Sequence, residues 1–187
     1  MTAVAPRTSQ PTPLSVGVVV WLSSELMFFA GLFAAWFTLR AGNDPWPPEG
    51  VELEVGRTAL ATAVLVTSSA TIHVAVGAAH RDDRVAAVRW LGVTGALGAL
   101  FLANTLSEWA AADFSIDSHA YGSIFYLLTG FHALHVAGGI LLMGAVAGAV
   151  VGRSRAPAAA TVEVAAAYWH FVDVVWLAVF ASVYLLA

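Results

Sequence analysis

Cysteine and lysine are both absent from this chain of 187 residues, and all eight basic side chains are arginines. Without cysteine the chain has no thiolate ligands, which excludes iron–sulfur clusters, thiolate zinc sites and cysteine-bridged copper centres. Charged residues make up 11% of the chain, against about 25% in a soluble domain. Hydrophobic residues reach 59%. The composition therefore indicates an integral membrane protein, and without a basic patch no nucleic-acid partner is expected.

Five apolar segments are long enough to cross a bilayer, which takes about 20 apolar residues in a helix. They are residues 15–39, 58–79, 88–108, 121–151 and 163–187. Because lipid cannot satisfy backbone hydrogen bonds, each segment must be helical, and glycines within the segments permit close helix contacts. We therefore predict an all-α fold: a single transmembrane five-helix bundle over residues 14–187, after a mobile polar tail over residues 1–13.

The placement of the arginines predicts the orientation, because cytoplasmic loops carry an excess of basic residues. With five spans, the N-terminal tail and the second and fourth loops share one side of the membrane. The arginines on that side are Arg7, Arg81, Arg84, Arg89, Arg153 and Arg155. The other side is rich in acids and has arginines only at helix ends. This bias places the N-terminus in the cytoplasm and the C-terminus outside.

Glu25 is a candidate for function, because it lies well inside the first predicted span. A charged group at the centre of a membrane helix costs about 3 kcal/mol on insertion scales, so such residues are usually paired or functional. One interpretation is an acid that handles protons or contacts lipid headgroups. The other is a partner in an interhelical hydrogen bond. Sequence reasoning alone leaves both open.

Two pairs of polar residues within the spans have helical spacing. His132 and His135 share one helix face, as do His170 and Asp173. A metal held by the two histidines is one hypothesis, completed by His170, Asp173 or His73, and haem ligation is another. A hydrogen-bonded structural pair is equally compatible with the spacing. An acid three residues from an imidazole can orient it, and we favour pairing of His170 and Asp173 with polar groups on neighbouring helices.

Four strings along the chain point to a known family. In order they are W-L-S-S-E-L-M-F-F-A-G-L-F, W-P-P, A-Y-G-S-I-F-Y-L-L-T-G-F-H-A-L-H-V and Y-W-H-F-V-D-V-V-W. They closely resemble subunit III of the aa3-type cytochrome c oxidases, over nearly the whole chain from about Val16 to Leu186. That family commonly has seven helices. This chain is similar to the five-helix form of actinobacterial oxidases, which lacks the first two.

The resemblance implies a subunit of a proton-translocating oxidase in a bacterial plasma membrane. Subunit III carries no haem or copper, so haem a, haem a3 and copper are expected in partner subunits. The expected partners are subunit I, in direct contact, subunit II, small subunits, structural phospholipids and, from the actinobacterial relatives, a cytochrome bcc complex. The expected role is to support proton uptake and to stabilise subunit I during oxygen reduction and proton pumping.

The resemblance also suggests roles for single residues, and it implies no catalytic residue and no metal ligand in this chain. Glu25 matches the membrane-buried, carbodiimide-reactive glutamate of the family. The residues that match its structural polar network are His132, His135, His170, Asp173 and Glu163. Arg153 or Arg155 is placed like the arginine that contacts a lipid phosphate, and His73 is a further lipid-binding candidate. The two missing helices remove a wall of the family's lipid cleft.

Two other functions stay open at the level of sequence. The nearer is a subunit III-like accessory protein of a nitric oxide reductase or a quinol oxidase, which shares the five-helix plan and the buried acid. The second is a stand-alone intramembrane metalloenzyme that uses the paired histidines, His170 and Asp173. A transporter is disfavoured, because the chain shows no internal repeat and no pair of broken helices.

Overall fold

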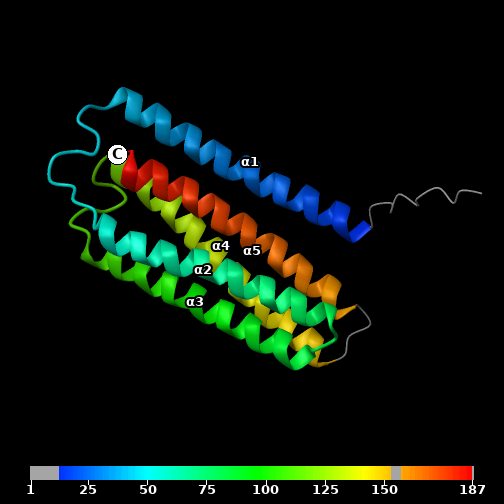
Figure 1. Ribbon diagram of the computed structural model, residues 1–187. Helices are drawn as coiled ribbons and strands as arrows, with labels where there is room; N and C mark the ends of the chain where they lie inside the picture. The colour runs from blue at the N-terminus through cyan, green and yellow to red at the C-terminus, as the bar shows by residue number, and fades with distance from the viewer. Residues whose placement is uncertain (1–12, 153–156, 187) are drawn as a thin grey trace, which may run out of the picture.

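The computed structural model of the chain describes residues 13–152 and 157–186. Within these ranges it has no strand and five helices that are long and apolar enough to cross a membrane (Figure 1). Their bounds are α1 Pro13–Gly42, α2 Val55–His80, α3 Arg84–Ala111, α4 Ala120–Val151 and α5 Ala158–Phe180, which continues into a short π-helical segment, η1 Ala181–Leu185. The predicted all-α fold with five spans is confirmed. Each helix begins one to five residues before its predicted span.

The helices form a bundle in which α2, α3, α4 and α5 make a compact group and α1 lies alongside it. Within the group, α3 packs along α2 and α4, and α5 also packs along both of these helices. The first helix packs mainly on α4 and less on α5, and Figure 1 shows it running beside α5. Only two of its described side chains, Phe29 and Trp36, are buried. Most of the surface of α1 is therefore left for lipid or for a partner.

Polar side-chain caps mark the starts of α3 and α4. The Asp83 carboxylate accepts a hydrogen bond from the backbone N–H of Ala86 at 3.0 Å and so caps α3. The backbone N–H of Gly122 donates to Nδ1 of His119 at 2.8 Å and caps α4. Just before α4, the Ser115 hydroxyl donates to Asp117 and lowers the pKa of that carboxyl. An ionised Asp117 suits this position, because helix N-termini favour negative charge.

Trp169 of α5 packs at the centre of the compact group, where it contacts α2, α3 and α4. Its indole is fully buried, and Nε1 donates to the hydroxyl of Ser68 on α2 at 2.8 Å. The ring lies in a slot formed by two glycines on facing helices: a Cβ on Gly98 of α3 would be 2.6 Å from it, and one on Gly139 of α4 would be 2.7 Å away. Small residues thus permit the close packing that the glycine content predicted.

Candidate functional site

Glu25 of α1 and His135 of α4 form a hydrogen-bonded pair inside the bundle. Oε2 of Glu25 lies 3.0 Å from Nε2 of His135, and the two side chains are 27% and 16% exposed. The other ring nitrogen of His135, Nδ1, lies 2.7 Å from the backbone carbonyl oxygen of Phe131. A carbonyl oxygen only accepts hydrogen bonds, so Nδ1 carries a hydrogen. Nδ1 is therefore a hydrogen-bond donor to the backbone, and Nε2 is the nitrogen that bonds to the carboxyl group of Glu25.

The pair therefore holds one proton between its two members. Either the proton is on Glu25 and the neutral imidazole of His135 accepts it, or His135 is an imidazolium that donates to a carboxylate. Both arrangements have zero net charge, which suits a low-dielectric site. Such a pair can hold a proton and transfer it between its members without adding charge to the membrane interior.

Aromatic side chains enclose this pair and join three helices around it. Nε1 of Trp21 donates to Oε1 of Glu25 at 3.2 Å, and the Trp21 ring stacks on Tyr168 of α5 at 4.9 Å between ring centroids. The Tyr168 hydroxyl donates to the backbone carbonyl of His135 at 3.0 Å. Because α1 has few other buried contacts, this group of side chains is the main polar connection that holds α1 to the bundle.

His170 and Asp173 of α5 meet on a single residue of α2. Nδ1 of His170 lies 2.9 Å from the Ser69 hydroxyl, and that hydroxyl donates to Oδ2 of Asp173. A hydroxyl has one hydrogen, so when it donates to Asp173 it must accept from Nδ1–H of His170. The predicted pairing of these two residues with a neighbouring helix agrees with this geometry. Sequence reasoning did not identify Ser69. The polar residues Ser68, Ser69 and His73 within an otherwise apolar span could have indicated it.

His132 stands apart from both groups. Its side chain is fully buried between the rings of Phe101 and Trp176, with centroid distances of 5.7 and 4.8 Å. Neither of its ring nitrogens has a hydrogen-bond partner among the residues that the structure describes. Although it lies three residues from His135, the structure does not bring it into the hydrogen bonds that the other predicted residues share.

The remaining candidates lie elsewhere. Glu163 is at the start of α5, where Oε1 lies 2.8 Å from Nε2 of His80 in an exposed ion pair. His73 is exposed on α2 and interacts electrostatically with His170, well inside the helix and away from its ends. Arg153 and Arg155 lie outside the described residues. Within 13–152 and 157–186, no group of three or more His, Asp or Glu side chains is arranged to hold a metal ion.

Glu108 of α3 is a half-buried acid whose interactions sequence reasoning missed. It accepts hydrogen bonds from the hydroxyl of Tyr184 at 3.0 Å and from that of Thr58 at 3.3 Å. Nearby, Arg57 of α2 donates to the side chain of Asn104 on α3. These bonds join α2, α3 and η1 at the end of the bundle opposite the His80–Glu163 pair. The only signal in the sequence was an acid in the last turns of a span.

Comparison with known proteins gives one consistent result. The family model described as cytochrome c oxidase subunit III matches residues 8–187. A probable cytochrome c oxidase subunit 3 from Nocardia farcinica is 45% identical over 94% of this chain and 89% of its own length. The corresponding protein of Mycobacterium tuberculosis is 43% identical over 98% of this chain and 94% of its own length. A cytochrome c oxidase subunit 3 from Thermostichus vulcanus is 38% identical over 91% and 86%.

Proposed function

Because this chain belongs to the cytochrome c oxidase subunit III family, we propose that it is the non-redox subunit III of an aa3-type oxidase. Family membership makes it a subunit of an oxidase complex and a multi-pass protein of a bacterial plasma membrane. The finer proposal is that it supports proton uptake, binds structural phospholipids and stabilises subunit I during oxygen reduction. Haem a, haem a3 and copper would lie in partner subunits, and electrons would not pass through this chain.

The Glu25–His135 pair is the observation that carries this proposal. It combines one shared proton with the main polar connection between α1 and the bundle. A change in the protonation of the pair would therefore also change how firmly α1 is held. In this proposal, the link between proton balance and packing is the means by which the chain protects subunit I during turnover.

Two substitutions of Glu25 separate the proton from the packing. In Glu25→Gln, the side-chain amide can still donate to Nε2 of His135, but the pair can no longer exchange a proton. In Glu25→Ala, both functions are lost. Each variant is made in the whole oxidase, and the measurements are the amount of chain that co-purifies with haem a and copper and the number of turnovers before inactivation.

We expect the Gln variant to assemble fully but to inactivate sooner, and the Ala variant also to assemble poorly. Glu163→Gln is the matched control, because it removes an acid whose ion pair with His80 is exposed. A Gln variant with the same turnover lifetime as the unmodified oxidase would refute the proton role. Failure of the unmodified chain to co-purify with haem a and copper would refute the subunit assignment.

Phospholipid binding is supported by a groove on the outside of α3 and α4. It has a volume of about 500 Å³ and an almost entirely apolar lining that includes Leu102, Leu106, Trp109, Tyr126 and Leu134. An apolar groove of this kind suits an acyl chain, because lipid tails offer dispersion contacts and no hydrogen bonds. Lipid mass spectrometry of the oxidase carrying Ala137→Trp, which fills the groove from its partly exposed lining, should show fewer retained phospholipids than the unmodified oxidase.

A further inference from the structure

Four polar side chains form a cluster on the seam between α2 and α5. They are Ser69 and His73 of α2, and His170 and Asp173 of α5; we call them the midplane cluster. Ser69 lies 14 positions after Val55 and 11 before His80, which is about 21 Å and about 17 Å along α2 at 1.5 Å per residue. The hydrocarbon core of a bilayer is about 30 Å thick, so the cluster is near its centre.

The midplane cluster has acceptor atoms that its own hydrogen bonds do not use. His170 donates through Nδ1 to Ser69, so its Nε2 is an acceptor when the ring is neutral. Oδ1 of Asp173 also has no hydrogen-bond partner among the described residues, but it is buried within the bundle, where a helix docked from outside cannot reach it. The ring of His73 is exposed and that of His170 is half-buried, so the cluster reaches the outer surface of the bundle.

Lipid cannot satisfy these atoms. Acyl chains contain no hydrogen-bonding groups, and headgroups lie about 15 Å away at the edge of the hydrocarbon core. Each unsatisfied polar group in that core costs several kcal/mol. Ionisable residues within membrane helices accordingly face other protein, or water in a cavity. A partly exposed cluster at this depth therefore indicates that protein covers it in the assembled membrane.

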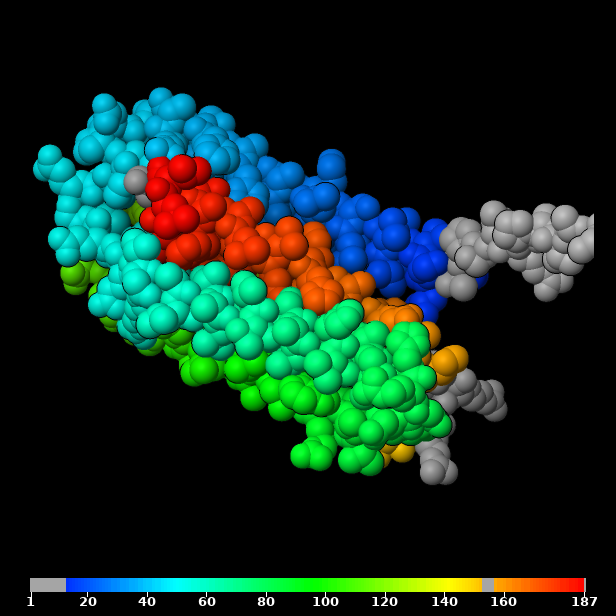
Figure 2. All heavy atoms as spheres, viewed as in Figure 1, coloured from blue at the N-terminus to red at the C-terminus, as the bar shows by residue number. Residues whose placement is uncertain are grey.

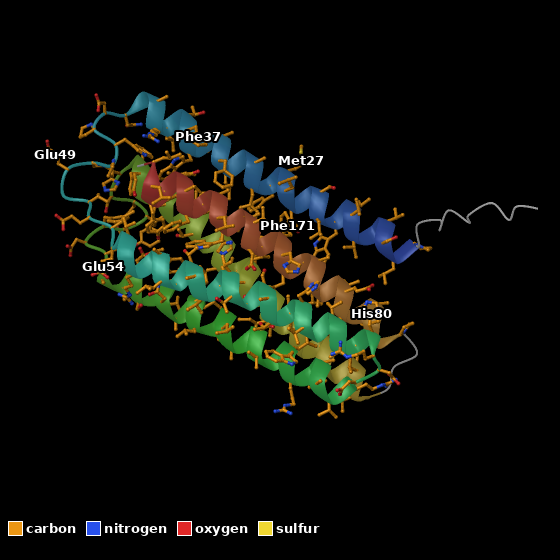
Figure 3. The ribbon with its side chains drawn as sticks, in the orientation of Figure 1. Met27, Phe37, Glu49, Glu54, His80 and Phe171 are labelled. Carbon is orange, nitrogen blue, oxygen red and sulfur yellow. The ribbon has the colours of Figure 1, made fainter. Side chains whose placement is uncertain are left out.

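The surface around the midplane cluster fits a helix. Figure 2 shows α1, α5 and α2 side by side on this face, and Figure 3 shows Phe171 in the space between α1 and α5. Small or β-branched residues predominate among the exposed neighbours of the cluster, with Ala167 and Val174 on α5 and Val66 and Ala70 on α2, and Leu177 is the larger exception. Small side chains let two membrane helices approach closely, and a polar group among them adds a hydrogen bond across the contact.

The outer face of α4 differs at the same depth. Its exposed residues include Leu127, Leu134 and Leu141, spaced by seven positions, and Leu134 borders the apolar groove. Leu134 is 64% exposed and Val174 of α5 is 65% exposed, so the two positions are matched in accessibility. They differ in their surroundings, which are apolar at Leu134 and polar beside Val174. The chemistry of the two faces therefore predicts lipid at one and protein at the other.

We infer that the face formed by α2 and α5 around the midplane cluster docks a transmembrane helix of a partner subunit, and that this helix carries a hydrogen-bond donor at mid-membrane depth. The donor is a hydroxyl, amide or indole group, because Nε2 of the half-buried His170 ring is an acceptor that no described hydrogen bond uses. The inference rests on the proposed function for the identity of the complex: the partner is another subunit of the same oxidase.

Site-specific photo-crosslinking in intact membranes tests this inference. A benzophenone amino acid replaces Val174 in one variant and Leu134 in the other, in the full-length chain assembled with its oxidase. We expect Val174 to give one crosslinked polypeptide, with the attachment site in a transmembrane segment close to a donor side chain. We expect Leu134 to give lipid adducts. Mass spectrometry of the purified complex identifies both products.

Lipid adducts from Val174 in a complex that still contains haem a and copper would overturn the inference and leave the proposed function standing. Equal protein crosslinking from Val174 and Leu134 would also overturn it, because the polarity of the face would then not select the partner. Ala167→Trp gives an independent test: its bulk should release the crosslinked partner in detergent, while Leu134→Trp should not. Retention of the partner in both variants would contradict the docking site.

Discussion

The slot that holds Trp169 gives the sharpest prediction from the structure. In Gly139→Ala, the new methyl group would lie 2.7 and 2.8 Å from two atoms of the Trp169 ring and 3.2 Å from the Tyr168 ring. Contacts below 3.0 Å force a shift, and Trp169 is held by its bond to Ser68. Overpacking of this kind costs about 1–3 kcal/mol. The variant should therefore unfold or dissociate at a lower temperature than the unmodified oxidase.

A second glycine on the same helix provides the control. A Cβ on Gly144 would meet no atom within 4 Å, so Gly144→Ala should keep the packing and gain about 0.5–1 kcal/mol of helix propensity. The assay is the temperature at which this chain separates from the detergent-purified oxidase. Equal dissociation temperatures for the Gly139→Ala and Gly144→Ala variants would refute the reasoning, because the slot would then accommodate a methyl group without strain.

A double mutant locates the cause. Trp169→Phe removes the ring atoms that the new methyl group would contact, and it also removes the hydrogen bond to Ser68, which is worth about 1 kcal/mol. If the contact is the cause, adding Gly139→Ala to Trp169→Phe should cost less than adding it to the unmodified chain. Additive losses would show that Gly139 acts through something other than Trp169.

Three further outcomes are expected from polar contacts between helices. In Ser69→Ala, neither oxygen of Asp173 has a hydrogen-bond donor among the described residues, so the variant should lose about 1–3 kcal/mol of stability in the same dissociation assay. The control is Thr67→Ala, which removes only a hydrogen bond within α2 and should change the stability by no more than about 0.5 kcal/mol. Asp173→Ala should reduce the yield of assembled oxidase more than the turnover of the enzyme that does assemble, and normal yield with abolished turnover would contradict this. Glu163→Gln breaks an exposed ion pair with His80, so it should cost at most about 1 kcal/mol, with less effect in high salt.

Much of the fold was predictable because the membrane imposes it. Apolar runs of sufficient length must be helical in lipid, so the five spans could be read directly, with errors confined to their ends. The same pattern placed Glu25, His132 and His170 within the spans, without indicating how deeply each would be buried. The predicted orientation rests on arginine placement alone and stays a prediction.

The partners of those polar residues could not be predicted, because the sequence does not show how each helix is rotated about its own axis. The five helices are apolar on nearly every side, so no amphipathic pattern shows which face of each helix turns inward. Nothing local therefore indicated that Glu25 would meet His135, a residue 110 positions away, or that His132 would have no hydrogen-bond partner among the described residues. The spacing of His132 and His135 suggested a pair, but helix packing separated their environments.

The sequence by itself determined that this is a five-helix membrane protein with an acid and histidines inside its spans and with the strings of its family. Length, hydropathy and residue type are local properties of the chain, so the sequence alone shows them. Only the tertiary structure decided that Ser69 joins His170 to Asp173, that Trp169 lies between two glycines, and that one face of the bundle is polar at its centre. These features depend on how each helix is rotated against its neighbours, which packing alone fixes.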